Sequence, residues 1–228
     1  MELAGQGYGN GAKLARVDVL VVGGHGKVAL RLLALLAERG DRARGVIRKP
    51  EQAADLEAIG AEPVLCDIEQ EELTPHVAGA DAVVFAAGAG PGSGAERKRT
   101  VDCGGAVKLI EACRANDVNR YVMVSALMVD HPDRWPEKMR PYYEAKAEAD
   151  AGLERAGLDH TIVRPGMLAD DPGDGKVSVA PDFESSGSIP REDVAAVLAE
   201  VLLAENTVSK AFDVLDGETP VAEAVRSL

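Results

Sequence analysis

Tyr142 and Lys146 could act together in a proton transfer. They are four residues apart, so on a helix both side chains lie on one face. A free tyrosine has a pKa of about 10 and is a poor base near neutral pH. A neighbouring ammonium stabilises the phenolate, so we expect it to lower the pKa of Tyr142. The pair predicts proton transfer to or from a substrate oxygen. A surface amphipathic helix can carry the same spacing by chance, and Tyr143 competes for the inward position.

A glycine-rich turn near the start of the chain predicts a phosphate site. Val19 to Val22 are continuous apolar residues, typical of a buried strand, and the apolar spacing becomes helical from Lys27. Free N–H groups and the dipole at a helix start attract a pyrophosphate. The spacing Gly23-x-x-Gly26-x-x-Ala29 is related to the dinucleotide fingerprint, although a purely structural turn is the alternative. The residues expected to contact the dinucleotide here are Gly23, Gly24, His25, Gly26, Lys27 and Val28. For His25, an exposed loop position away from the phosphate is the alternative.

The residues after the second expected strand favour NADP(H) over NAD(H). An NAD site commonly has an acidic residue there, about 20 residues past the glycines, which holds the ribose 2′-hydroxyl. Here Arg48 and Lys49 occupy that place, and a guanidinium can bind a 2′-phosphate. A solvated pair at a loop tip is the alternative. Asp67 is placed either to accept a hydrogen bond from an adenine amino group or to cap the next helix. Small residues that leave space for the cofactor, or simply pack closely, are Ala86, Ala87 and Gly88.

Composition narrows the classes of protein. A chain of 228 residues with 46% hydrophobic content suits one large globular domain. The net charge of −13 argues against general nucleic-acid or anionic-membrane binding, and we see no apolar run near ~20 residues that could span a membrane. Cys66, Cys103 and Cys113 lack metal-ligand spacing and fit a reducing cytoplasm, so we expect no metal site and a cytoplasmic location. We expect residues 1–15 to be a mobile tail, 16–228 to be the domain, and the protein to be a monomer or homodimer.

The order of the expected elements predicts an α/β fold. Alternating strands and helices imply a single-domain, Rossmann-type, doubly wound parallel sheet in three layers. The expected strands are 19–22, 43–47, 61–67, 81–85, 120–125, 160–164 and 211–215. The expected helices begin at 27 and then cover 50–59, 69–73, 97–116, 141–155, 190–203 and the tail, with 168–188 an irregular loop. Ligands of such sheets bind beyond the carboxyl ends of the strands, so we expect the site there.

Motifs spread over the chain after residue 16 are shared with one superfamily. They are Gly23-Gly24-His25-Gly26-Lys27-Val28-Ala29, Arg48-Lys49-Pro50, Cys66-Asp67-Ile68, Phe85-Ala86-Ala87-Gly88, Arg120-Tyr121-Val122-Met123-Val124-Ser125-Ala126, Tyr142 with Lys146, Arg164-Pro165-Gly166 and Ile189-Pro190-Arg191-Glu192-Asp193-Val194-Ala195. In these motifs the chain resembles the short-chain dehydrogenase/reductases. It is most similar to their atypical NAD(P)-binding branch of NmrA-like and flavin/biliverdin-reductase-B-like proteins. The resemblance implies cofactor contacts from Asp67 and Ile68, and hydride transfer with Tyr142 as proton donor and Lys146 at the nicotinamide ribose.

The same resemblance implies a serine or threonine near the end of the fifth strand, beside the tyrosine. Ser125 is the nearest match, but many relatives carry the hydroxyl one or two residues later, where this chain has Ala126 and Leu127. Ser125 is therefore either a catalytic hydroxyl or a structural one at a strand end. Two stretches are candidate lids over the substrate: residues 168–188 and the loop that precedes Tyr142. The lid residues in that loop are His131, Trp135, Met139 and Arg140.

Three functions remain open from the sequence. The first is an NADP-dependent oxidoreductase that transfers hydride between NADP(H) and a small carbonyl, quinone or flavin-like substrate. The second is a non-catalytic module that senses the NADP/NADPH ratio and reports it to a protein partner. The third is an epimerase or dehydratase that recycles its bound nicotinamide. Fold alone does not separate them.

Overall fold

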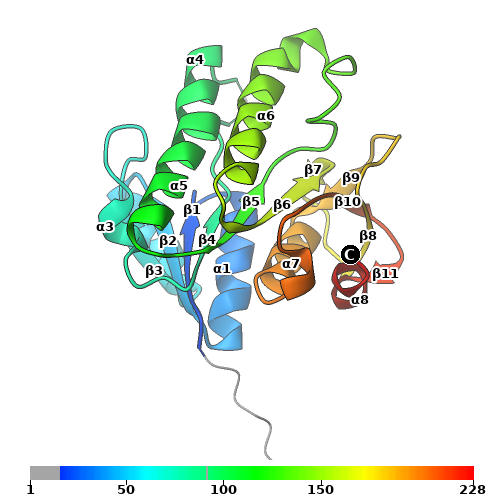
Figure 1. Cartoon of the computed structure of the whole chain (residues 1–228). Coiled ribbons are helices and arrows are strands. Elements are labelled where there is room, and N and C mark those ends of the chain that lie inside the picture. The colour runs from blue at the N-terminus through cyan, green and yellow to red at the C-terminus, as the bar shows by residue number, and fades with distance from the viewer. Residues whose placement is uncertain (1–15, 91) are drawn as a thin grey trace, which may run out of the picture.

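A nine-stranded sheet forms the centre of the computed structural model, which describes residues 16–90 and 92–228 (Figure 1). The expected tail, residues 1–15, lies outside the described residues. The strand order is β3-β2-β1-β4-β5-β6-β10-β8-β11. Its first six strands follow the order known for dinucleotide-binding sheets, 3-2-1-4-5-6. The predicted doubly wound α/β fold is therefore confirmed.

The bounds of the elements agree with most of the expected ranges. The strands of the large sheet are β1 (Asp18–Val22), β2 (Arg42–Ile47), β3 (Glu62–Leu65), β4 (Ala82–Phe85), β5 (Arg120–Val124), β6 (Asp159–Pro165), β8 (Lys176–Ala180), β10 (Lys210–Asp216) and β11 (Thr219–Pro220). The α-helices are α1 (Lys27–Arg39), α2 (Ala53–Ala58), α3 (Thr74–Val77), α4 (Ala95–Arg97), α5 (Gly105–Ala115), α6 (Arg140–Glu154), α7 (Arg191–Val201) and α8 (Val221–Arg226). Short η elements are η1 (Pro50–Gln52), η2 (Lys98–Gly104), η3 (Glu137–Met139) and η4 (Glu205–Thr207).

The alternation of side chains along β1 gives the sheet two apolar faces. Val19 and Val21 belong to a buried cluster with residues of α1, α7 and α8. Leu20 and Val22 belong to a second cluster with residues of α5 and α6, which stand together over the opposite face (Figure 1). Helices on both faces make the three expected layers. No helix within residues 16–90 and 92–228 is long and apolar enough to cross a membrane.

Three local expectations are wrong. Residues 168–188 are not an irregular loop, because β7 (Met167–Ala169) pairs in parallel with β9 (Ser188–Pro190), and β8 lies between them in the chain. Strand β8 also runs antiparallel to β10 and β11, so the sheet is mostly parallel rather than wholly so. The acidic stretch 69–73 is a turn, and helix α3 starts only at Thr74, with a proline in its first turn.

The long helix expected over 97–116 is interrupted. Its first part, η2, has π-helical hydrogen bonding over Lys98–Gly104, and regular α-helix follows in α5. Such π-helical turns frequently occur at functional sites. Here the turn buries the carboxylate of Asp102, which is 2% exposed, between the sheet and α6.

Candidate functional site

The glycine turn after β1 brings three strands together by backbone contact. Gly23 has a φ of +86°, and a Cβ on it would lie 2.7 Å from the Cα of Ala87. A Cβ on Gly24 would lie 2.7 Å from the Cα of Gly45, and the Gly24 N–H donates to the Val46 carbonyl at 2.8 Å. Side chains are therefore excluded at Gly23 and Gly24, and the ends of β1, β2 and β4 approach closely.

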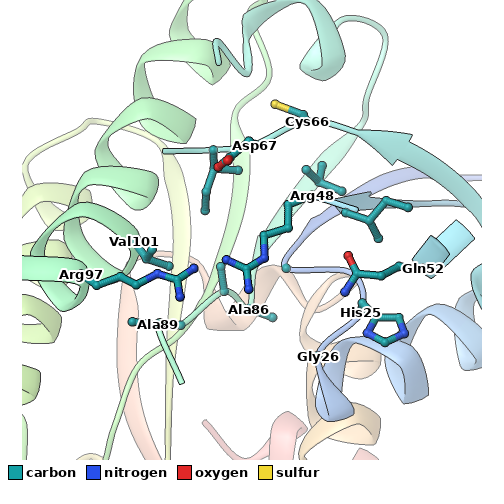
Figure 2. Close-up of a pocket in the computed structure, with 16 residues that line it drawn as sticks. His25, Gly26, Arg48, Gln52, Cys66, Asp67, Ala86, Ala89, Arg97 and Val101 are labelled. Carbon is teal, nitrogen blue, oxygen red and sulfur yellow. The ribbon is translucent and has the colours of Figure 1, made fainter. Parts of the chain in front are cut away.

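A cavity of about 300 Å³ lies at these strand ends (Figure 2). Nine residues expected at the cofactor line it: Gly23, His25, Gly26, Arg48, Asp67, Ile68, Ala86, Ala87 and Gly88. It is also lined by residues that sequence reasoning missed, namely Val46, Ile47, Gln52, Cys66, Ala89, Arg97 and Val101. The cavity lies where open α/β sheets bind their ligands, outside the carboxyl ends of the strands.

Two guanidinium groups face one another across this cavity, those of Arg48 and Arg97 (Figure 2). Arg48 follows β2 directly and is exposed, while Arg97 ends α4 and also pairs with Glu69 at 3.3 Å. The signal for Arg97 was present in the sequence. The run Glu96-Arg97-Lys98-Arg99 is a basic cluster after the fourth strand in a strongly acidic chain.

Five other expected cofactor residues do not line the cavity, and one of them, Lys146, is described with Tyr142 below. Lys27 extends to Asp170, with 2.7 Å between Nζ and Oδ2. Lys49 is exposed and lies 3.8 Å from Glu51. Gly24 and Val28 are buried. Whether Lys27 and Lys49 contact a dinucleotide remains a prediction, since both side chains have other partners here.

Two of the lining side chains already have hydrogen-bond partners. His25 Nε2 lies 2.7 Å from Asp55 Oδ2, so one ring nitrogen is occupied. Asp67 Oδ1 accepts the N–H of Glu69 at 3.0 Å. Asp67 therefore closes the turn after β3 rather than capping a helix, since the next helix begins only at Thr74, and it also faces the cavity.

The donors around the cavity fit an anionic dinucleotide. Helix α1 begins there after Gly26, with no side-chain hydrogen bond to its N-terminus and no acidic residue in its first turn. Its free N–H groups and dipole favour phosphate. Arg48 and Arg97 add two positive charges that face one another across the same space. The glycine turn leaves room for a ligand against the backbone, so these residues could hold a nucleotide diphosphate.

The Tyr142–Lys146 pair lies on α6, beyond the end of this cavity. Lys146 is 5% exposed, and its Nζ donates to the carbonyl of Val124 at 2.9 Å. The same Nζ lies 3.8 Å from Asp102 Oδ1. Tyr142 is half-buried; its ring meets that of Tyr143 edge to face, with 5.3 Å between centroids, and Lys98 Nζ lies 5.6 Å from its centroid.

The expected effect of Lys146 on its neighbour is not found. Burial, followed by the negative charge of Asp102, raises the pKa of Tyr142 well above its ordinary value. Burial also lowers the pKa of Lys146, while Asp102 and Asp150 oppose that shift. The phenol is therefore held in its protonated form, which suits a proton donor rather than a base.

Ser125 is buried directly after β5. Its side chain is 3% exposed, and its hydroxyl lies near the buried carboxylate of Asp150 and opposes the rise that burial causes in the pKa of that carboxyl. Its Oγ has no partner in ordinary hydrogen-bond geometry among residues 16–90 and 92–228. Its role, catalytic or structural, remains a prediction.

Buried charges surround Arg164 at the end of β6. Its Nε lies 3.2 Å from Asp150 Oδ2 and its Nη1 2.7 Å from Asp130 Oδ2. Asp213 on β10 is also buried, and burial raises its pKa to about 6. Arg164 was recognised in the sequence only as part of the motif Arg164-Pro165-Gly166, whereas Asp150 and Asp213 belong to no local motif and were not identified.

The two candidate lids are joined to one another. His131 Nε2 lies 2.9 Å from Asp182 Oδ1, and Arg134 donates to the carbonyl of Glu184. Trp135 stacks on Tyr143, with ring centroids 5.5 Å apart and planes 10° from parallel. The loop before α6 thus rests both on the segment after β8 and on the helix that carries Tyr142.

Known proteins resemble this chain over nearly its whole length. A family model described as NAD(P)H-binding matches residues 23–205. The "Uncharacterized sugar epimerase YhfK" of Bacillus subtilis is 43% identical, covering 93% of this chain and 100% of that protein. The yeast UPF0659 protein YMR090W, from Saccharomyces cerevisiae, is 36% identical, covering 94% of this chain and 100% of that protein.

Solved structures agree with these similarities. The "Putative NAD-dependent epimerase/dehydratase" of Bacillus halodurans superimposes with a TM-score of 0.90 at 42% identity, covering 93% of this chain and 100% of that one. The oxidoreductase ylbE of Lactococcus lactis gives a TM-score of 0.81 at 27% identity, covering 92% and 96%. The resemblance to the atypical NAD(P)-binding branch, expected from the motifs, is confirmed by these findings.

Proposed function

We propose, on the premise that this chain belongs to the NAD(P)H-binding family, that it is an NADP(H)-dependent oxidoreductase acting on a small carbonyl, quinone or flavin-like substrate. The observation that carries the proposal is a continuous arrangement of the described residues. Ala89 is one of the residues that line the cavity at the ends of β1, β2 and β4. Asp102 accepts the Ala89 N–H at 3.0 Å and lies 3.8 Å from Lys146.

The preference for NADP(H) rests on charge. A carboxylate at the end of β2 would repel a 2′-phosphate, and this chain has Arg48 there, opposite Arg97. Two guanidinium groups can bind one phosphate through charge-assisted hydrogen bonds. A neutral ribose hydroxyl cannot form comparable charge-assisted hydrogen bonds with two guanidinium groups, so we expect NADH to bind more weakly than NADPH.

In the proposed reaction a bound dinucleotide would supply a hydride to the substrate carbon. Tyr142 gives its phenolic proton to the substrate oxygen, and solvent then returns a proton to the phenolate. Lys146, held by the Val124 carbonyl, keeps a positive charge near that phenolate.

The test uses two matched variants, Tyr142→Phe and Tyr143→Phe, with a panel of carbonyls, quinones and flavins. We expect NADPH to bind both variants as tightly as it binds the wild type. We expect turnover to fall about 10²- to 10⁴-fold for Tyr142→Phe, because a general acid contributes about that much, and only slightly for Tyr143→Phe. Equal turnover by the wild type and Tyr142→Phe would remove Tyr142 from the mechanism.

An epimerase or dehydratase is the second candidate, favoured by the names of two full-length relatives. In that reaction a bound oxidised dinucleotide would accept a hydride from the substrate and return it within one turnover, so no net NADPH is formed or consumed. Isomerisation of a sugar substrate at constant NADPH absorbance would favour it over a reductase. Cofactor binding without any turnover would instead favour the sensing module. A cytoplasmic location and a monomer or homodimer remain predictions.

A further inference from the structure

Asp102 is a buried carboxylate that sequence reasoning did not identify. It lies within the π-helical turn η2, is 2% exposed, and touches two functional regions at once. Its Oδ2 accepts the Ala89 N–H at 3.0 Å, in the loop that lines the cavity after β4. Its Oδ1 lies 3.8 Å from the Nζ of Lys146. Within residues 16–90 and 92–228, Lys146 is the only cation in a salt bridge with it.

Lys146 needs a negatively charged partner because its buried environment disfavours the charged ammonium form. Burial of an ammonium favours the neutral amine. The Val124 carbonyl accepts one of its hydrogen bonds, and the ring of Phe85 lies 6.0 Å from the nitrogen. The titratable groups around it are Asp102 from η2, and Tyr142 and Asp150 from α6. Asp150 already pairs with Arg164 at 3.2 Å, so Asp102 is the carboxylate left for Lys146.

We propose that Asp102 is a positioning residue that keeps Lys146 in its charged ammonium form beside Tyr142 and ties it to the cofactor loop. This inference rests on the proposed function, since it assigns a task to the lysine of the same site. The charge and the hydrogen bond of Asp102 have separate tasks. The charge holds the proton on Lys146, and the carboxylate oxygen fixes the loop at Ala89.

Two substitutions separate these tasks. Asp102→Asn removes the charge but keeps an oxygen that can accept the Ala89 N–H, whereas Asp102→Ala removes both. We expect NADPH affinity measured by fluorescence to stay within about twofold of wild type in Asp102→Asn. We expect it to fall about tenfold in Asp102→Ala, because a buried backbone N–H is left without a partner. Equal NADPH affinities for these two variants would overturn the role of the hydrogen bond.

The charge is tested in the protein without cofactor, by NMR titration of lysine labelled with ¹³C. The Lys146→Met variant assigns the signal. We expect the midpoint of Lys146 to fall by about one pH unit or more in Asp102→Asn, a tenfold loss of proton affinity, because opposite charge at this distance favours the ammonium. Glu144→Gln is the control, since it removes an exposed charge from the same helix. If Asp102→Asn is poorly folded, Asp102→Ser provides the same measurement.

An unchanged midpoint in the uncharged variants would overturn the inference, whatever the activity. A lowered midpoint in a protein that reduces no substrate would support it while contradicting the proposed oxidoreductase. In an active enzyme we also expect the basic limb of the pH profile of kcat/KM to move to lower pH in Asp102→Asn. A merely structural role would lower kcat/KM at all pH values without moving that limb.

Discussion

The crevice at the ends of β1, β2 and β4 is formed largely by backbone and small side chains, whereas the region under α6 and at the end of β6 contains buried charges. In the crevice, Gly23 and Gly24 lie so close to the neighbouring backbone segments that an added Cβ atom would clash with them. Near β6, Arg164 is packed between carboxylates, and Lys146 lies close to Asp102. The first region has the shape and donors for a phosphate. The second has the ionisable groups for proton transfer.

The contrast extends to how the two regions satisfy their polar atoms. Gly24 donates its N–H to the Val46 carbonyl of β2, and Gly26 donates its N–H to the Gly23 carbonyl inside the turn. On the other side, Asp150 and Asp213 each accept a hydrogen bond at Oδ2, but the buried Oδ1 atoms of both and the Oγ of Ser125 have no partner in ordinary hydrogen-bond geometry among the described residues. Unpaired buried polar atoms cost stability, and proteins tend to retain them where function needs them. We therefore expect backbone substitutions to affect cofactor binding and charge substitutions to affect chemistry and pH dependence.

A single methyl group in the turn should have the largest effect. Gly23→Ala places a Cβ 2.7 Å from Ala87 and adds left-handed strain at φ +86°. We expect the free energy of unfolding to fall by about 3 kcal/mol or more and NADPH binding to be lost. The control is Gly40→Ala, which has a φ of +90° but no atom within 4 Å of the added Cβ.

For Gly40→Ala we expect a loss of only about 1–2 kcal/mol and unchanged NADPH affinity. Chemical denaturation and fluorescence titration measure both variants. If Gly23→Ala bound NADPH like Gly40→Ala, the crevice would not depend on close backbone contact, and the contrast between the two regions would fail.

Removal of the Arg48 guanidinium should have the next largest effect. The loss of affinity should be large for NADPH and small for NADH. For Arg48→Ala we expect NADPH affinity to fall about 10- to 100-fold, because a charge-assisted hydrogen bond to phosphate contributes about 1.5–3 kcal/mol. NADH affinity should hardly change. Arg155→Ala is the matched control, since Arg155 is an exposed guanidinium at the C-terminal end of α6 and was not expected at the cofactor. Equal losses for NADPH and NADH would show that Arg48 does not read the 2′-phosphate.

Substitution of Asp213, a buried carboxylate in the charged region at the end of β6, should have a smaller effect, which appears in the pH dependence of stability. Burial raises the pKa of Asp213 to about 6, above about 3.9 in the unfolded chain. Its contribution to stability is therefore complete below about pH 4 and is lost as the pH rises through about 6. We compare how much the free energy of unfolding changes between about pH 4 and about pH 8 in wild type and in Asp213→Asn. The two changes should differ by about 1–2 kcal/mol.

The direction of that change is fixed by the sign of the shift. Wild type loses stability over this range through Asp213, so the variant should lose less. Asp216→Asn, an exposed position on the same strand, should follow wild type. Denaturant titrations at both pH values provide the measurement, and parallel curves for Asp213→Asn and wild type would contradict the assignment.

The cofactor side could be predicted from the sequence because its signals are local. A strand, a glycine turn and a helix within about twenty residues set the crevice, and Arg48 follows the next strand. The nine expected residues that line the cavity all lie directly after β1, β2, β3 or β4. Arg97 was missed although its basic cluster was visible, because no motif connects α4 to the crevice.

The charged region under α6 and at the end of β6 could not be predicted because its contacts join residues that are far apart in the sequence. Lys146 meets a carbonyl 22 residues away, and His131 meets a carboxylate 51 residues away. The pairing of β7 with β9, which overturned the expected loop, likewise depends on register between separate segments. The pKa of Tyr142 was predicted with the wrong sign, because burial and Asp102 outweigh the lysine four residues on.

A crystal structure of the protein with NADPH tests the central claim most directly. We predict that the pyrophosphate lies at the N-terminus of α1, with the 2′-phosphate between Arg48 and Arg97. The nicotinamide should lie at the Asp102 end of the crevice, with C4 facing the space beside the Tyr142 hydroxyl. A dinucleotide bound elsewhere, or in this crevice with its nicotinamide directed away from α6, would contradict the account.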